Sequence, residues 1–189
     1  MKTIKRNLLA VIATLAVAAT AAVAAPKAST PDSNSNNRQI VKQVRRELVT
    51  LPYYGVFDNL AYEVNGSTVI LSGQVTRPTT RSDAGRRVAR IAGVQKVVNN
   101  IEVLPLSSFD DSIRRQAYRT VFNTAGLHRY AMGANPSIHI IVNRGQLTLE
   151  GVVSSKMDRQ LADMAARRVF GAFSVTNNLR LENDETEPS

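Results

Sequence analysis

The sequence predicts an α+β protein built from two tandem copies of one unit, each of the form helix-strand-strand-helix-strand. The segments 69–75 (VILSGQV) and 147–153 (LTLEGVV) both alternate like strands and both contain a glycine, Gly73 and Gly151, 78 positions apart. The same offset aligns 64–103 with 142–181 without a gap and keeps the spacing of the apolar positions. Chance does not preserve such spacing, so we interpret the two halves as a duplication.

In the first copy, apolar residues recur at helical spacing between 40 and 48 and predict a helix that ends before Pro52. Two strands follow, joined at Asn65-Gly66, which is the strongest short hairpin signal. A second helix presents Ala84, Val88 and Ile91 on one face. A third strand over 97–103 completes the unit.

The second copy repeats this order, with a first helix that we expect to begin at the capping sequence Asp110-Asp111-Ser112. We interpret the two aspartates as helix caps rather than as a metal pair. Asn143-Arg144-Gly145 is a looser counterpart of the first hairpin turn. If the second helix is a right-handed crossover, the third strand runs parallel to the second. Each unit then has a three-stranded mixed sheet with both helices on one face.

The glycine inside the middle strand of each copy needs an explanation, because glycine weakens a strand. The alternation places Gly73 toward the helices, so we expect it to let a helix backbone approach the sheet. A β-bulge is the alternative. Asn99 and Asn177, at matching positions of the third strands, are expected to bond a loop backbone.

The two ends of the chain differ from its middle. Residues 1–24 combine Lys2, Lys5 and Arg6 with an apolar run and end in Ala-Val-Ala, which is typical of a cleaved secretory signal peptide. Residues 25–37 are expected to be a disordered leader, and 183–189 an acidic tail. Loss of 1–24 lowers the net charge from +9 to +6. We therefore expect a periplasmic protein with no transmembrane segment in the mature chain, which prefers acidic partners other than nucleic acid.

The repeated unit, at 38–104 and 110–182, resembles the BON domain, and the tandem arrangement resembles that of periplasmic dual-BON proteins. This resemblance implies a non-catalytic protein that binds phospholipid or supports envelope integrity and protein quality control under stress. It does not favour a lipoprotein, because the chain has no cysteine to carry a lipid. The second copy departs from the pattern at Arg144 and Ala172. In the first copy the matching residues are Val64, Asn65, Gly66, Val69, Leu71, Gly73, Val75, Gly93, Val94, Val97, Asn99, Ile101 and Val103.

The sequence offers no catalytic or metal-binding pattern. Its two histidines, His128 and His139, lack metal-ligand spacing, and the strand alternation turns His139 outward. We therefore expect no enzyme activity and no cofactor.

Two helices of the second copy are candidates for binding lipid or a partner. At outward positions of its second helix, Asp83 and Arg86 of the first copy are replaced by Leu161 and Met164. Apolar side chains among cations suit a lipid interface, although packing within the chain would explain them equally well. The basic second helix of the first copy is interpreted as a solvated face. The predicted binding residues are Arg115, Tyr118, Arg119, Phe122, Arg159, Leu161, Met164 and Arg168.

Together with the resemblance, these features predict a protein that binds anionic phospholipid surfaces and supports envelope integrity. The alternative is a periplasmic chaperone-like protein that binds unfolded or outer-membrane proteins. Lipid binding through cations would be sensitive to salt, whereas client binding would not.

Overall fold

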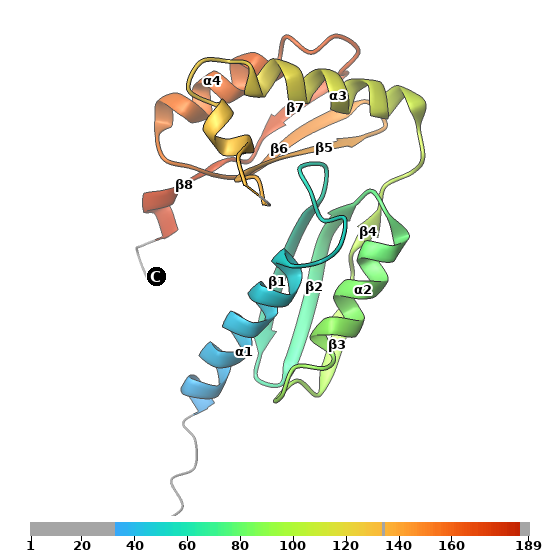
Figure 1. The fold of residues 1–189 in the computed structure, drawn as a ribbon, viewed down its shortest axis with the longest axis vertical. Coiled ribbons are helices and arrows are strands. Elements are labelled where there is room, and N and C mark those ends of the chain that lie inside the picture. The colour runs from blue at the N-terminus through green and yellow to red at the C-terminus, as the bar shows by residue number, and fades with distance from the viewer. Residues whose placement is uncertain (1–32, 134, 186–189) are drawn as a thin grey trace, which may run out of the picture. The chain divides into compact units, whose positions relative to one another are not determined.

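The computed structural model describes residues 33–133 and 135–185 (Figure 1). The predicted signal peptide, the first part of the predicted leader and the end of the acidic tail lie outside the described residues. Among the residues described, no helix has both the length and the apolarity needed to cross a bilayer.

The first unit places two helices on one face of a mixed sheet (Figure 1). β1 and β2 pair antiparallel, and β2 pairs parallel with a third strand that is divided into β3 and β4. The first helix begins at Ser33, so residues 33–37 of the predicted leader are helical rather than disordered. The elements are α1 Ser33–Val49, β1 Asn59–Asn65, β2 Thr68–Val75, α2 Pro78–Val88, β3 Lys96–Asn99 and β4 Glu102–Val103.

The second unit repeats this topology and adds two short 3₁₀ helices. One of these, η1, lies between the first helix and the first strand. The other, η2, follows the last strand and includes the start of the predicted acidic tail. The elements are α3 Ser108–Phe122, η1 His128–Ala131, β5 Ile138–Asn143, β6 Gln146–Val153, α4 Lys156–Ala166, β7 Ser174–Asn177, β8 Arg180–Leu181 and η2 Glu182–Glu185.

Each unit has its own apolar core between the helices and the sheet. In the first unit, Ile40, Val44 and Leu48 of α1 are buried, as their helical spacing predicts. The predicted α+β fold, with two helices over a three-stranded mixed sheet in each unit, is confirmed. The division of the third strand was not predicted.

An asparagine at the same position of each unit explains why the third strand is divided. The side-chain amide of Asn99 donates to the carbonyl of Arg81 in α2 at 2.9 Å, and its oxygen accepts from the N–H of Ile101 at 3.3 Å. Asn177 makes the same two contacts, with Arg159 and Leu179. In both units the asparagine therefore bonds backbone between the two strand segments, as expected, and in addition a carbonyl of the second helix. It holds a local break in the strand.

The two strand glycines are required by the neighbouring strand rather than by a helix. Gly73 has φ +112°, and a Cβ there would lie 2.2 Å from the carbonyl oxygen of Asn59 in β1. Gly151 has φ +118°, and its Cβ would lie 2.0 Å from the carbonyl oxygen of Ser137. The expected helix approach is therefore wrong, and the close backbone belongs to the chain entering the first strand of the hairpin.

Both hairpins have two-residue loops. Asn65 pairs with Thr68, and only Gly66 in that loop has a positive φ. In the second unit the loop is Arg144-Gly145, and both residues have a positive φ, as a type I′ turn requires. The second turn is therefore as tight as the first, although its sequence suggested a looser one.

Candidate lipid- or partner-binding surface

The start of α3 is fixed by a cap and by a buried carboxylate. The side chain of Ser107 caps the helix by accepting from the N–H of Asp110 at 3.1 Å. Asp110 is buried, and its carboxylate accepts from the N–H groups of Arg144 and Gly145 at 2.9 and 2.8 Å. The predicted capping role of Asp110 is thus taken by Ser107. Asp110 instead ties α3 to the hairpin turn of its own unit.

The other predicted cap, Asp111, forms an ion pair with Arg114. The Arg114 guanidinium is buried and donates to the carbonyl of Val142 in β5 at 2.6 Å. Both aspartates are thus engaged in protein contacts. Within 33–133 and 135–185, no group of three or more His, Asp or Glu side chains could hold a metal ion.

The outer side of α3 presents three of the predicted binding residues. Arg115, Tyr118 and Arg119 are exposed, whereas Phe122 is only 5 % exposed and belongs to the core. Phe122 is therefore a packing residue, and the prediction that it binds lipid is corrected. The ring of Tyr118 packs edge-on against the ring of Phe122, with the two centroids 5.0 Å apart.

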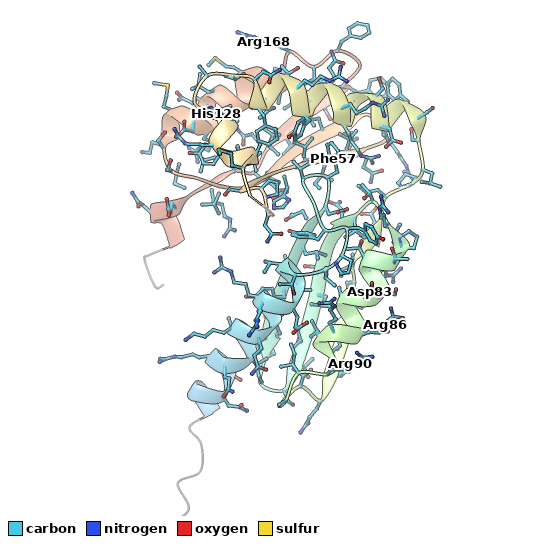
Figure 2. The ribbon with its side chains drawn as sticks, viewed as in Figure 1. Phe57, Asp83, Arg86, Arg90, His128 and Arg168 are labelled. Carbon is cyan, nitrogen blue, oxygen red and sulfur yellow. The ribbon has the colours of Figure 1, made fainter. Side chains whose placement is uncertain are left out.

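A segment from the first unit covers part of the second. The carbonyl of Val56 accepts from the N–H of Ile140 in β5 at 2.7 Å, and Phe57 packs against the core and against Tyr118 (Figure 2). Arg115 and Arg119 complete a shallow groove of about 300 Å³ beside these apolar side chains. The α3 groove, as we call it, combines two cations with an apolar floor.

His139 is buried by the same covering segment, contrary to the prediction that it faces outward. Only 9 % of the residue is exposed; its ring packs on Tyr54, and its Nδ1 lies 3.3 Å from the Gly55 carbonyl oxygen. Burial lowers the pKa of His139 below its usual 6.5 and raises the pKa of Tyr54 to about 12. In the neutral imidazole, the tautomer with the proton on Nδ1 can donate to this carbonyl.

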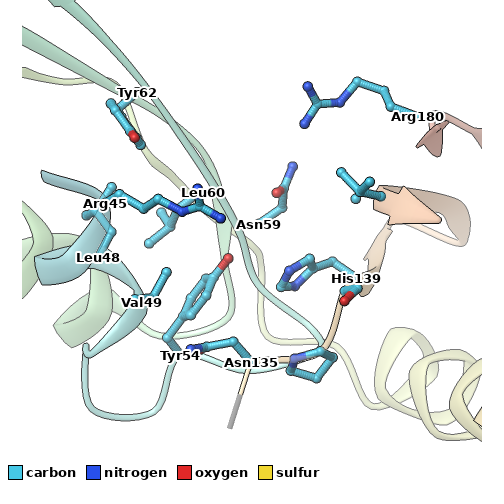
Figure 3. Close-up of a pocket in the computed structure, with 14 residues that line it drawn as sticks. Arg45, Leu48, Val49, Tyr54, Asn59, Leu60, Tyr62, Asn135, His139 and Arg180 are labelled. Atoms are coloured by element: carbon cyan, nitrogen blue, oxygen red, sulfur yellow. The ribbon is translucent and has the colours of Figure 1, made fainter. Parts of the chain in front are cut away.

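A cavity of about 510 Å³ lies beside His139 and Tyr54 (Figure 3). Arg45 and Tyr62 also line the cavity, and Arg180 lies across it from them. None of the predicted binding residues contributes to this cavity. Its walls mix polar side chains with apolar ones such as Leu48, Leu60 and Val152, and no sequence pattern predicted a site there.

The second candidate helix, α4, presents fewer apolar side chains than predicted. Met164 is 49 % exposed and Arg168 is exposed (Figure 2), but Leu161 is half-buried and packs against the core. The outward placement of Leu161 is therefore corrected. Met164 and the half-buried Arg159 line a shallow hollow of about 380 Å³ together with Gln160, Asp163 and Asn177.

The basic helix of the first unit forms two ion pairs through residues whose counterparts in α4 are apolar. Arg86 pairs with Asp83, and Arg87 lies 3.5 Å from Glu47 of α1 (Figure 2). This arrangement fits the interpretation of α2 as a solvated face.

Three exposed phenylalanines were missed by the sequence reasoning. Phe109, Phe170 and Phe173 are 46 %, 86 % and 76 % exposed. The repeat contained a signal for two of them, because the 78-residue offset pairs Phe170 and Phe173 with Ala92 and Gln95 of the first unit.

Comparison with known proteins identifies the family. The sequence matches the BON domain at residues 36–105 and 110–183. No curated protein matches the chain. Among solved structures, the C-terminal domain of CdsD, a structural protein of the type III secretion system of Chlamydia trachomatis, is similar at 13 % identity and a TM-score of 0.30. That match covers 77 % of this chain and 65 % of the other, so the chain spans less than two thirds of its length.

A second structure of CdsD matches at 9 % identity and a TM-score of 0.28, covering 80 % of this chain and all of the other. BON domains are non-catalytic and are associated with the cell envelope and with phospholipid binding. With two matches that together span most of its length, the chain belongs to the BON domain family and carries two BON domains in tandem.

Proposed function

We propose that this protein is exported to the periplasm, where its second BON domain binds anionic phospholipid surfaces and supports envelope integrity. The proposal needs no catalytic group, cofactor or metal. The contact surface consists of Arg115, Tyr118 and Arg119 on α3, of Arg159 and Met164 on α4, and of Arg168 just beyond the end of α4.

The observation that carries the proposal is the pairing of the carboxylates on these two helices. Asp110 accepts from backbone N–H groups, and Asp111, Asp158 and Asp163 pair with Arg114, Arg129 and Arg167. In the described part of the chain, the arginines of the proposed surface form no ion pair. They are left to interact with anions from outside the protein.

The size of the expected effect follows from the number of these cations. A basic side chain close to an anionic membrane contributes about 1 kcal/mol, which is screened by salt. A few arginines with one tyrosine and one methionine therefore support weak, reversible and salt-sensitive binding. Such binding suits a protein that contacts a membrane surface without spanning it.

Vesicle flotation tests the proposal with two variants of equal charge. Arg115→Gln/Arg119→Gln removes two cations from α3, and the matched control Arg86→Gln/Arg90→Gln removes two from the first domain. We expect the α3 variant to bind anionic vesicles roughly 10- to 30-fold more weakly, from about 1 kcal/mol per arginine. The control should bind nearly as the parent does.

Equal losses in both variants would contradict a specific surface and indicate a diffuse attraction. The chaperone-like alternative replaces the proposal if the parent protein binds no vesicles but binds a denatured outer-membrane protein, and if that protein–protein binding does not depend on salt.

A further inference from the structure

An aromatic tip projects from the end of the second BON domain, and the proposed arginine surface does not account for it. The tip consists of Phe109 at the start of α3, and of Phe170 and Phe173 in the connection from α4 to β7. The rings of Phe109 and Phe173 pack together, with centroids 5.6 Å apart. Phe170 is 86 % exposed, which leaves almost its whole ring in contact with water.

The tip rests on a fixed platform, the β5–β6 turn. The N–H of Phe173 donates to the carbonyl of Gly145 at 2.8 Å, and a Cβ on Gly145 would lie 2.6 Å from the Phe173 ring. The buried carboxylate of Asp110 holds the same turn through two backbone N–H groups. The rings of Phe109 and Phe173 are therefore held in place by backbone contacts and close packing.

The fold itself does not require these rings. The first BON domain has Ala92 and Gln95 where the second has Phe170 and Phe173, and both domains have the same topology. Exposing a phenylalanine to water has a free-energy cost that alanine or glutamine avoids. A contact outside the domain accounts for the two replacements.

The charges around the tip indicate the chemistry of its partner. Arg144 lies in the platform turn and Arg168 lies two residues before Phe170, and both are exposed. The connection from α4 to β7, residues 167–173, contains two arginines and no acidic residue, and one of the two, Arg167, pairs with Asp163 of α4. Aromatic rings edged by cations match the border between the acyl chains and the phosphates of an anionic bilayer.

We propose that Phe109, Phe170 and Phe173 insert into the interfacial layer of an anionic bilayer, with Arg144 and Arg168 at the level of the phosphates. This inference rests on the proposed function and specifies how the second domain is anchored. It adds an apolar contribution that salt does not screen to the electrostatic contribution of the α3 and α4 arginines.

Binding to vesicles of phosphatidylglycerol and phosphatidylcholine tests whether the tip makes the contact. We expect Phe170→Ser/Phe173→Ser to bind at least ~10-fold more weakly, because two aromatic side chains leave the interface. The control Tyr53→Ser/Met132→Ser removes exposed side chains outside the tip and outside the arginine surface, at 69 % and 68 % exposure, and should bind as the parent does. Because Phe173 also packs on the platform, Phe170→Ser alone is measured in parallel, and its melting temperature should be unchanged.

Fluorescence tests insertion directly, since the chain contains no tryptophan. The emission of Phe170→Trp should shift to shorter wavelength on adding these vesicles and should be quenched by lipids labelled near the headgroup. Met132→Trp should show neither change.

Several results would overturn the inference. If the parent protein binds vesicles and the Phe170→Ser variants bind them equally well, the tip is not the contact. Binding without a shift of the Phe170→Trp emission would refute insertion. A shift that depends on protein concentration without lipid would identify a second copy of the chain as the occupant. A parent that binds no vesicles would overturn both the proposed function and the insertion.

Discussion

Replacing either strand glycine by alanine should destabilise its domain, because two separate costs meet at one backbone position. Gly73 combines φ +112° with a carbonyl oxygen 2.2 Å from the site of a Cβ. An alanine there would have to adopt a backbone conformation that L-residues rarely occupy. It would also have to displace the start of β1, whose Asn59 supplies that oxygen.

The two costs can be estimated separately. A non-glycine residue in a sparsely populated conformation costs about 1–3 kcal/mol, and overpacking that forces a backbone shift costs about 1–3 kcal/mol. The sum, about 2–6 kcal/mol, is a large part of the stability of a typical domain. Gly151, with φ +118° and an oxygen at 2.0 Å, should behave alike.

Two further glycines of the first domain serve as controls. Gly66→Ala places an alanine at a positive φ of +62°, but its Cβ would meet no atom within 4 Å, so the substitution should cost only about 1–2 kcal/mol. Gly55→Ala meets no atom within 4 Å and has no positive φ, so it should change stability by less than about 0.5 kcal/mol. Urea unfolding of each variant gives the free energies. If Gly73→Ala unfolds like Gly66→Ala, the close approach of β1 makes no contribution and the reasoning fails.

Three further substitutions test buried polar contacts. Burial lowers the pKa of His139, so at acidic pH the unfolded chain takes up a proton that the folded chain excludes. The free energy of unfolding should therefore fall as the pH drops below 6.5. Between pH 7.5 and 5, the free energy of unfolding of His139→Asn should fall less than that of the parent. Asp110→Ala leaves two N–H groups without an acceptor and should cost about 1–3 kcal/mol in urea unfolding; an unchanged midpoint would contradict this. Asn177→Ala should cost about 1–2 kcal/mol and increase amide exchange at Leu179; unchanged exchange would argue against the bridge.

The fold could be predicted because two independent signals agree along the chain. Apolar periodicity gives the order of helices and strands, and the 78-residue repeat shows the same order twice. The break in the third strand could not be read from periodicity, because Asn99 and Asn177 act through a carbonyl of the crossover helix. The reason for Gly73 and Gly151 was equally hidden, since it depends on the path of the chain entering the first strand.

The binding surface could be predicted only where helical periodicity alone decides exposure. Arg115 and Arg119 are exposed as their spacing requires. Phe122 ends α3 and Leu161 lies in the middle of α4; both contact the core, whose extent cannot be read from helical spacing. His139 is covered by a segment 84 residues earlier in the chain, which no local pattern reveals.

The measurement that tests the central claim most directly is flotation of the mature protein with neutral and anionic vesicles at low salt and at about 1 M salt, where the screening length falls to about 3 Å. The account predicts that the protein floats with anionic vesicles at low salt, binds neutral vesicles weakly, and loses most of its anionic binding at high salt. Equal binding to both vesicle types, or no binding to either, would contradict the claim that the second BON domain recognises anionic phospholipid surfaces.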